Sequence, residues 1–401
     1  MNQYDLIIAG AGISGMSLAY YSGRSGLRTL VIEKDERTGG CFSSHRLEDG
    51  SDFWFELGAH TCYNSYGNLL GIIEGCGILD RMRKREKVGF KMLIGDRITS
   101  ISSQLNFLEL LFSAPRLFSL KKAGQSVESY YAKIVGRNNY EKVFGPAFNA
   151  VISQRANDFP ADMLFKKRPR RKDVMKSFTL EGGLLTILDA IRGQRNVTVV
   201  TGSGVQSVLY GGGLFDVRTA DGGLYNSRNL ALAVPPVAAA ALLGPSFPEL
   251  ALKISRIKCE SVETMGVVLR KDALAIGPLA GIIAADDSFY SAVSRDTVRH
   301  GLYRGFSFHF KPGRTDRHAK LQRITEVLGV GRSRVDHVAT RNNVVPSLAV
   351  GHESIIGDID ALLAGKRLLL AGNYFSGMAI EDCVSRSLSE FRRLENMPER
   401  A

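Results

Sequence analysis

The sequence predicts an α/β protein in which a discontinuous Rossmann-like domain carries an inserted mixed-sheet substrate domain and a helical lobe. Three observations support this prediction. An apolar run over residues 5–9 leads into the glycine-rich turn GAGISG and then into a helical pattern that ends near residue 23. A second apolar run, over 29–32, ends in an acidic residue, the order expected of a βαβ unit that binds a dinucleotide. A strand-like run at 366–371, again followed by glycine, returns the C-terminal part of the chain to the same domain.

The glycine-rich turn has the spacing of a phosphate-binding site. Its first glycine suits a tight turn, its second lets the backbone approach a pyrophosphate, and its third lets helix and strand pack closely. The N–H groups at the start of the helix face the phosphates. The acid that ends the second strand lies eighteen residues after the turn and can accept both ribose hydroxyls of an adenosine. Glycine triplets also occur in ordinary loops, but here every part of the unit is present. We therefore predict a dinucleotide site that includes Gly10, Gly12, Ile13, Ser14, Gly15 and Glu33.

The residues after this acid indicate which dinucleotide binds. The run from Glu33 to Ser43, EKDERTGGCFS, resembles the second fingerprint E-x-x-x-R-x-G-G-R-x-x-S/T of flavoproteins. That pattern belongs to the superfamily of monoamine oxidases, phytoene desaturases and protoporphyrinogen oxidases, and the resemblance implies FAD. Cys41 stands where the second arginine is usual, so one phosphate or flavin contact is left unassigned. The contacts that the resemblance implies here are those of Glu33, Lys34, Arg37, Gly39, Gly40 and Cys41.

Three later stretches resemble other flavin-binding parts of the same superfamily. The stretch Glu56 to His60 resembles its acid-x-G-x-H/N segment, and for His60 we favour a flavin-edge or structural role over that of a catalytic base. FTLEGGL at 178–184 resembles the turn that re-enters the FAD domain, and AGNYFSGMAIEDC at 371–383 is closest to the terminal motif of protoporphyrinogen oxidases. A helix that begins there would stabilise negative charge on a reduced flavin. The implied contacts are Gly58, Ala59, His60, Val205, Ala233, Gly372, Asn373, Met378, Ala379 and Ile380.

The middle of the chain carries no nucleotide pattern. Residues 63–80 and 127–152 are expected to be helical, the second stretch with a break at Gly145-Pro146. Residues 105–120 form a mostly apolar helix with one polar stripe, which Pro115 would kink or split. This helix is either a core element or an interfacial segment dipping into a bilayer, and the resemblance to protoporphyrinogen oxidases slightly favours the second. The run FKKRPRRK at 165–172 is expected to be a solvated loop, or else to contact anionic lipid or guide carboxylated substrates.

These assignments divide the chain into five segments. Strand-like stretches at 263–269, 281–284 and 305–310 predict the sheet of the substrate domain. The predicted segments are the first FAD-binding part at 1–83, a helical and substrate insertion at 84–177, the second FAD-binding part at 178–244, the substrate sheet at 245–349 and the third FAD-binding part at 350–401.

Composition limits the partners and the compartment. The five cysteines are odd in number and lack a C-x-x-C pair, which argues for a reducing compartment and against a zinc site. The net charge of +12 could attract acidic partners, but no nucleic-acid motif accompanies it, so we expect no nucleic acid. The longest apolar run, at 230–243, is too short to span a membrane and is broken by two prolines. We expect a cytoplasmic protein that can associate peripherally with the inner face of the cell membrane, of open oligomeric state.

The resemblance implies an FAD-dependent oxidase or dehydrogenase that acts on a carboxylated, mainly apolar small molecule. The nearest match indicates protoporphyrinogen IX or coproporphyrinogen III, with oxygen as the electron acceptor. Lys91 and Arg97 are candidates for binding its carboxylates. The residues do not identify a catalytic acid, base or nucleophile. Two alternatives stay open: another flavoenzyme of the superfamily (an amine oxidase, a carotenoid-type desaturase or a specialised-metabolite dehydrogenase), and a flavin-binding protein without catalysis.

Overall fold

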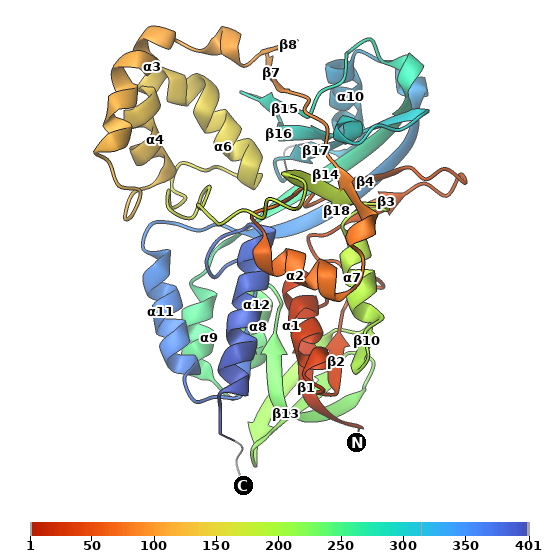
Figure 1. Cartoon of the computed structure of the whole chain (residues 1–401), viewed down its shortest axis with the longest axis vertical. Helices are drawn as coiled ribbons and strands as arrows, with labels where there is room; N and C mark the ends of the chain where they lie inside the picture. The colour runs from red at the N-terminus through yellow and green to blue at the C-terminus, as the bar shows by residue number, and fades with distance from the viewer. Residues whose placement is uncertain (1, 314, 399–401) are drawn as a thin grey trace.

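A central parallel sheet organises the lower half of the molecule (Figure 1). The structure, a computed structural model, describes residues 2–313 and 315–398. The strand order is β10-β2-β1-β13-β12-β11, and β19 pairs with β13 as well. The antiparallel pairings of β12 with β11 and β13 interrupt the otherwise parallel arrangement. The bounds are β1 Asn2–Ala9, β2 Thr29–Ile32, β10 Val197–Val200, β11 Val205–Gly211, β12 Leu214–Thr219, β13 Leu224–Leu232 and β19 Leu368–Leu370.

Both faces of this sheet are covered, which explains its uninterrupted apolar strands. Leu6 and Ile8 share one buried cluster with α1, α2, α7 and α12, whereas Ile7 and Ala9 belong to the other, which includes α8, α9 and α11. The bounds of these helices are α1 Ile13–Arg24, α2 Gly67–Gly75, α7 Leu185–Arg192, α8 Pro236–Leu243, α9 Pro248–Ser255, α11 His352–Leu363 and α12 Ile380–Glu395. The helix expected over 63–80 is shorter, because residues 62–63 pair in a small sheet instead.

A second sheet lies above the first, with the strand order β18-β14-β17-β16-β15-β7-β8. Phe306, Phe308 and Phe310 of β17 pack in one cluster with helix α10, so the alternate residues Ser307 and His309 face the opposite side, toward the dinucleotide domain. The bounds are β7 Phe90–Ile94, β8 Arg97–Ser100, β14 Cys259–Arg270, β15 Gly281–Ala284, β16 Phe289–Ser294, β17 Tyr303–Phe310, β18 Val335–Pro346 and α10 Arg317–Leu328.

Two small sheets connect these layers. Strand β3 pairs with β4, and β9 pairs with both β5 and β6. Their bounds are β3 Ser44–Arg46, β4 Trp54–Glu56, β5 Cys62–Tyr63, β6 Met82–Lys84 and β9 Ser177–Leu180. Phe55 of β4 and its flanking residues Phe53 and Leu57 pack against Val268 of the second sheet.

The helical lobe contains α3 Phe107–Ser113, α4 Val127–Val135, α5 Arg137–Asn139 and α6 Gly145–Ile152. As expected, the 105–120 segment is split at Pro115, where a 3₁₀ turn follows α3. The break expected at Gly145-Pro146 is wrong. A π-helical turn at 140–144 leads directly into α6, and the proline occupies its first turn, where an N–H is not required. The chain breaks at Gly136 instead, which adopts a positive φ of 89°.

None of the helices in the described ranges combines the length and hydropathy that crossing a bilayer requires.

Candidate dinucleotide site and adjoining cavity

The glycine-rich turn lies between β1 and α1 and leaves backbone open to a ligand. Gly10 has a φ of 99°, and a side chain there would meet the carbonyl oxygen of Ala233, so the position requires glycine. Above Gly12, the nearest atoms that a Cβ would meet are Gly39 O and Gly40 Cα, both at 3.8 Å. A Cβ at Gly12 would make only ordinary contacts with this second loop, so the close approach of a pyrophosphate that the glycine spacing predicts stays a prediction.

Glu33 ties this turn to the end of β2. It is 8% exposed, and its Oε2 accepts a hydrogen bond from the backbone N–H of Ala11 at 2.8 Å. Its Oε1 accepts from the N–H of Asp35 at 3.0 Å. Each carboxylate oxygen keeps acceptor capacity beyond these bonds. The residue can therefore hold the turn and still accept from a ribose hydroxyl.

The second fingerprint folds around Arg37. Its Nη1 donates to the carbonyl oxygens of Thr38 (3.0 Å) and Phe42 (3.2 Å), and its Nη2 donates to Ser43 Oγ at 3.0 Å. The guanidinium thereby fixes the loop, and Gly39 at its centre donates its N–H to Ala11 O at 2.9 Å. Lys34, in contrast, has an exposed side chain that contacts Asp35.

His60 is half-buried beside this loop. Burial, followed by the charges of Arg85 and His309, lowers its pKa to about 3. Its Nδ1 lies 2.7 Å from Thr61 Oγ1, and its carbonyl oxygen accepts from Arg85 Nη1 at 2.8 Å. A histidine with so low a pKa is a weak base at neutral pH, which agrees with the structural or flavin-edge role expected for it.

The remaining predicted contacts gather where the parallel strands end. Ala233 follows β13 and donates its N–H to Ala9 O at 2.8 Å, Val205 begins β11, and Gly372 and Asn373 follow β19. Met378 and Ala379 immediately precede α12, which begins at Ile380. In open α/β sheets, ligands bind at this carboxyl edge.

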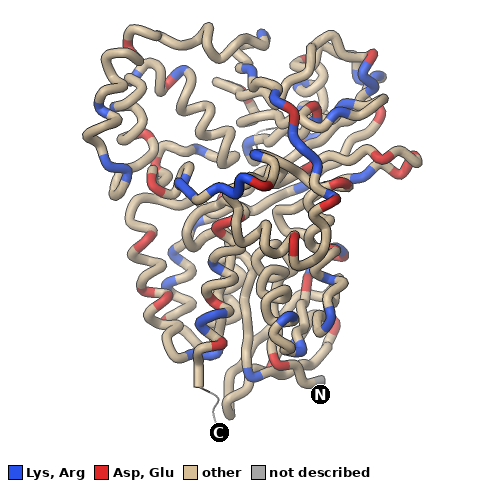
Figure 2. Tube along the Cα trace, in the orientation of Figure 1, with Lys and Arg blue, Asp and Glu red and all other residues tan. Residues whose placement is uncertain are grey.

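The basic run at 165–172 is not simply a solvated loop, because part of it packs on the start of α12 (Figure 2). Arg168 Nη2 donates to Asp382 Oδ1 at 2.7 Å, and Lys166 Nζ contacts the same oxygen at 3.3 Å. Asp382 is 6% exposed. Arg171 pairs with Glu74 at 2.5 Å. The sequence could not indicate this docking because the partners lie far away in the chain.

The two candidate carboxylate ligands lie elsewhere. Lys91 and Arg97 are both exposed, on β7 and β8 at one edge of the second sheet. Neither residue lines the cavity described next.

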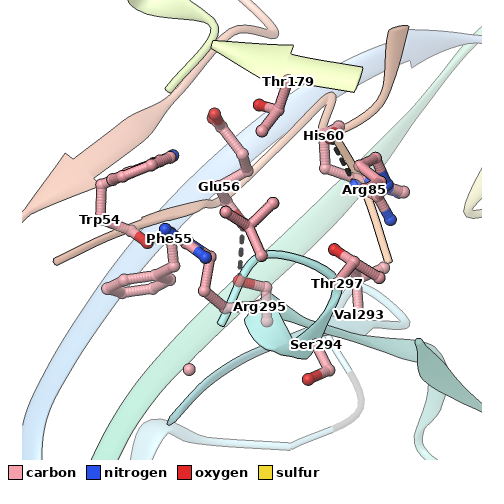
Figure 3. Close-up of a pocket in the computed structure, with 13 residues that line it drawn as sticks. Trp54, Phe55, Glu56, His60, Arg85, Thr179, Val293, Ser294, Arg295 and Thr297 are labelled. Carbon is pink, nitrogen blue, oxygen red and sulfur yellow. Dashed lines mark hydrogen bonds between the residues drawn. The ribbon is translucent and has the colours of Figure 1, made fainter. Parts of the chain in front are cut away.

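A cavity of about 30 Å³ lies between the second sheet and β4, with His60 in its wall (Figure 3). Arg295 donates through Nε to Trp54 O at 2.8 Å, and its guanidinium stacks on the Trp54 ring at 3.9 Å. Its buried Nη1 has no hydrogen-bond partner, and neither does Thr179 Oγ1. Both residues line the cavity, so an occupant with acceptor oxygens would satisfy both groups. The lining residues are Trp54, Phe55, Glu56, His60, Arg85, Thr179, Val293, Ser294, Arg295, Thr297, Val298, Gly305 and Ser307.

The charges around this cavity favour an anion. Burial lowers the pKa of Arg295 to about 10 and also lowers that of Arg85. Among the described residues, no carboxylate lies within 4 Å of either guanidinium. The nearby acid, Glu56, accepts from Leu184 N at 2.8 Å, and burial raises its pKa to about 7. Two cations thus lie near a carboxyl group whose ionised form is disfavoured by burial.

Sequence reasoning missed a polar group on the inner face of the second sheet. Thr264 Oγ1 and His309 Nδ1 are 3.0 Å apart, and burial lowers the pKa of His309 to about 4. Ser291, which pairs with His309 across the sheet, has a buried hydroxyl without a hydrogen-bond partner. The alternation in GFSFHF offered a signal, because a histidine between phenylalanines on a strand points away from the apolar face.

Comparison with known proteins supports the nucleotide-binding assignment. Residues 8–74 match the model of a family described as NAD(P)-binding Rossmann-like domain. A 15-cis-phytoene desaturase of Arabidopsis thaliana is 35% identical over 81 residues, which cover 20% of this chain and 14% of the desaturase. A Dictyostelium discoideum protein, "Probable flavin-containing monoamine oxidase A", is 31% identical over 75 residues, 19% of this chain and 16% of that protein. The chain thus matches only a small part of these relatives' length.

Similarity to solved structures extends over the whole fold. A protein from Exiguobacterium sp. 255-15, "Putative protoporphyrinogen oxidase", superposes with a TM-score of 0.75 at 18% identity, covering 99% of this chain and 100% of that one. A putrescine oxidase double mutant superposes with a TM-score of 0.71 at 13% identity, covering 98% and 99%. These findings confirm the predicted fold class and support FAD as the cofactor. The chain therefore shares the fold of these two oxidases, and its residues 8–74 form a Rossmann-like nucleotide-binding segment.

Proposed function

We propose that this protein is an FAD-dependent oxidoreductase whose substrate is carboxylated and mainly apolar, of the porphyrinogen type. The observation that carries the proposal is that His60 lines a cavity together with Arg85 and Arg295, while its neighbour Ala59 donates its N–H to Cys41 O in the second fingerprint. Among the described residues, neither arginine forms an ion pair with a carboxylate. When bound, FAD would supply the chemistry of accepting a hydride from a substrate C–H bond, with oxygen as the final acceptor.

The chain's own residues would bind the cofactor and orient the substrate beside it. The open backbone at Gly12 and the N-terminus of α1 suit the diphosphate, and Glu33 suits the adenosine ribose. Arg85 and Arg295 are placed to hold a substrate carboxylate, because its charge would compensate two guanidiniums that burial destabilises. The Thr264–His309 pair gives the substrate domain a polar position that faces the dinucleotide domain.

The test is anaerobic mixing of the FAD-loaded protein with protoporphyrinogen IX, coproporphyrinogen III, amines and polyenes, following the flavin absorbance. We expect bleaching by a porphyrinogen. Arg295→Gln should raise KM for that substrate at least tenfold, whereas Arg299→Gln, an exposed arginine paired with Glu86 at 2.7 Å, should not. Bleaching by an amine or a polyene alone would assign one of the alternative flavoenzyme activities. Bleaching by none of these compounds would favour a non-catalytic flavin protein.

We also propose that the helical lobe contacts an anionic membrane surface, which would place the protein at the inner face of the cell membrane. Large apolar side chains on α3 and the following turn are 53–93% exposed, an unusual concentration for so short a segment. Lys121 and Lys122 follow immediately and supply positive charge. The exposed residues are Phe107, Leu108, Leu111, Phe112, Leu117 and Phe118.

A further inference from the structure

Strand β18 presents alternate residues to the dinucleotide domain. His337 Nε2 lies 2.7 Å from His45 Nε2, and Asn343 Nδ2 donates to Leu57 O at 3.1 Å. Arg341 lies on the same face between them, and its Nη2 donates to Asp35 Oδ2 at 2.9 Å. The substrate domain thus inserts a guanidinium into the cofactor half of the molecule.

Arg341 meets the second fingerprint at its centre. Its partner Asp35 lies between Glu33, the proposed ribose ligand, and Arg37, which fixes the loop. Asp35 uses one oxygen for Arg341 and the other for Lys34. The Nε of Arg341 is buried and has no hydrogen-bond partner. A buried guanidinium N–H without a hydrogen-bond acceptor lowers the stability of the folded protein, and a bound ligand with an acceptor oxygen would remove this cost.

The charge of Arg341 acts at the position where the fingerprint departs from its usual form. Burial raises the pKa of the Cys41 thiol, and Arg341 is the charge that opposes this shift. Burial lowers the pKa of Arg37, and repulsion by Arg341 lowers it further. The ion pair of Arg341 with Asp35, two residues before Arg37, places this charge at the same loop.

We infer that Arg341 supplies, from the substrate domain, the cationic contact to the FAD diphosphate that the usual arginine at position 41 would supply. The inference rests on the proposed binding of FAD. It explains why a cysteine is compatible with the fingerprint in this chain: a second guanidinium at position 41 would be repelled by Arg341. It also makes cofactor affinity depend on the packing of the two domains.

The test is titration of the apoprotein with FAD and with ADP, followed by fluorescence or calorimetry. Arg341→Gln should weaken both ligands at least tenfold and reduce the salt dependence of binding. Cys41→Arg should weaken binding or leave it unchanged in the wild type, yet restore at least half of the lost binding free energy in Arg341→Gln. Arg334→Gln, an exposed arginine just before the same strand, is the matched control. Circular dichroism and apoprotein melting temperature establish that each variant is folded.

Asp35→Asn separates a ligand contact from a purely structural ion pair. If Arg341 contacts the cofactor, Asp35→Asn should change FAD affinity less than threefold, because the guanidinium remains. Equal losses in Asp35→Asn and Arg341→Gln, or no rescue by Cys41→Arg, would overturn the inference. Unchanged affinity in Arg341→Gln would do the same while leaving the proposed function intact. Absence of FAD binding by the wild type would instead overturn the proposed function itself.

Discussion

Replacement of Glu33 by alanine tests whether one carboxylate both holds the glycine-rich turn and binds the cofactor. The substitution removes the acceptor for two backbone N–H groups, those of Ala11 and Asp35. Ala11 is completely buried, so water cannot replace its partner. Hydrogen bonds to charged groups contribute about 1.5–3 kcal/mol each, and a buried donor left unpaired costs about 1–3 kcal/mol. Because Asp35 is only partly buried, we expect the free energy of unfolding of the apoprotein to fall by about 3 kcal/mol.

Chemical denaturation of the apoprotein measures this loss, and titration of the folded variant with FAD measures the second role. Losing the ribose contact should weaken FAD binding by a further ~1–3 kcal/mol. Glu33→Gln keeps one acceptor oxygen and should lose about half as much in each assay. Glu36→Ala, an exposed acid in the same loop, is the control. A drop in apoprotein stability below about 1 kcal/mol would refute the structural role that the geometry assigns.

Three further outcomes are expected. Since burial raises the pKa of Glu56 from 4.5 to about 7, the folded state retains a proton that the unfolded state has lost. Stability should therefore fall by up to about 3 kcal/mol as pH rises from about 4.5 to 7, and Glu56→Gln should flatten denaturation curves measured across that range. Replacing Leu108, Leu111 and Phe112 with serine should weaken sedimentation with anionic liposomes without releasing flavin; wild-type protein that fails to sediment at low salt would contradict the membrane proposal. Gly136→Ala should destabilise the fold by about 1–3 kcal/mol in thermal unfolding, because φ 89° and ψ 151° are almost exclusive to glycine and a Cβ would also meet the Glu109 side chain; an unchanged melting temperature would show that neither constraint holds.

The parts of the fold that sequence predicted well are those specified locally. The glycines, the first helix and the acid at the end of β2 lie within one βαβ unit. Within such a unit, residues that are close in sequence are also close in the structure. The position of the helix break could not be predicted from local sequence alone. Glycine followed by proline is the stronger local signal, yet the break falls at Gly136, where the Glu109 carboxylate accepts from the N–H groups of residues 138 and 139 at 2.9 Å. A partner almost thirty residues away decides the outcome.

In the candidate site, too, residues specified by local motifs could be predicted and residues contributed by distant segments could not. The residues of the two fingerprints follow from motifs, whereas Arg295, His309 and Arg341 reach the site through the register of a sheet assembled from distant strands. Periodicity indicates which residues share a face of a strand, but it does not indicate what the face meets. The basic run at 165–172 packs on the start of α12 because Arg168 finds a partner in Asp382, more than two hundred residues later in the chain.

The assembly of the central sheet from three separate segments has a consequence for biosynthesis. Leu230–Leu232 of β13 are fully buried, and their neighbours on one side are Leu368–Leu370 of β19. During translation, a nascent chain therefore carries an open apolar strand edge from the synthesis of β13 until β19 emerges from the ribosome. Such an edge invites pairing with other chains. Because α12 begins later still, the candidate dinucleotide site is complete only after this helix has also emerged from the ribosome, so the open strand edge exists before any ligand can bind there and protect it.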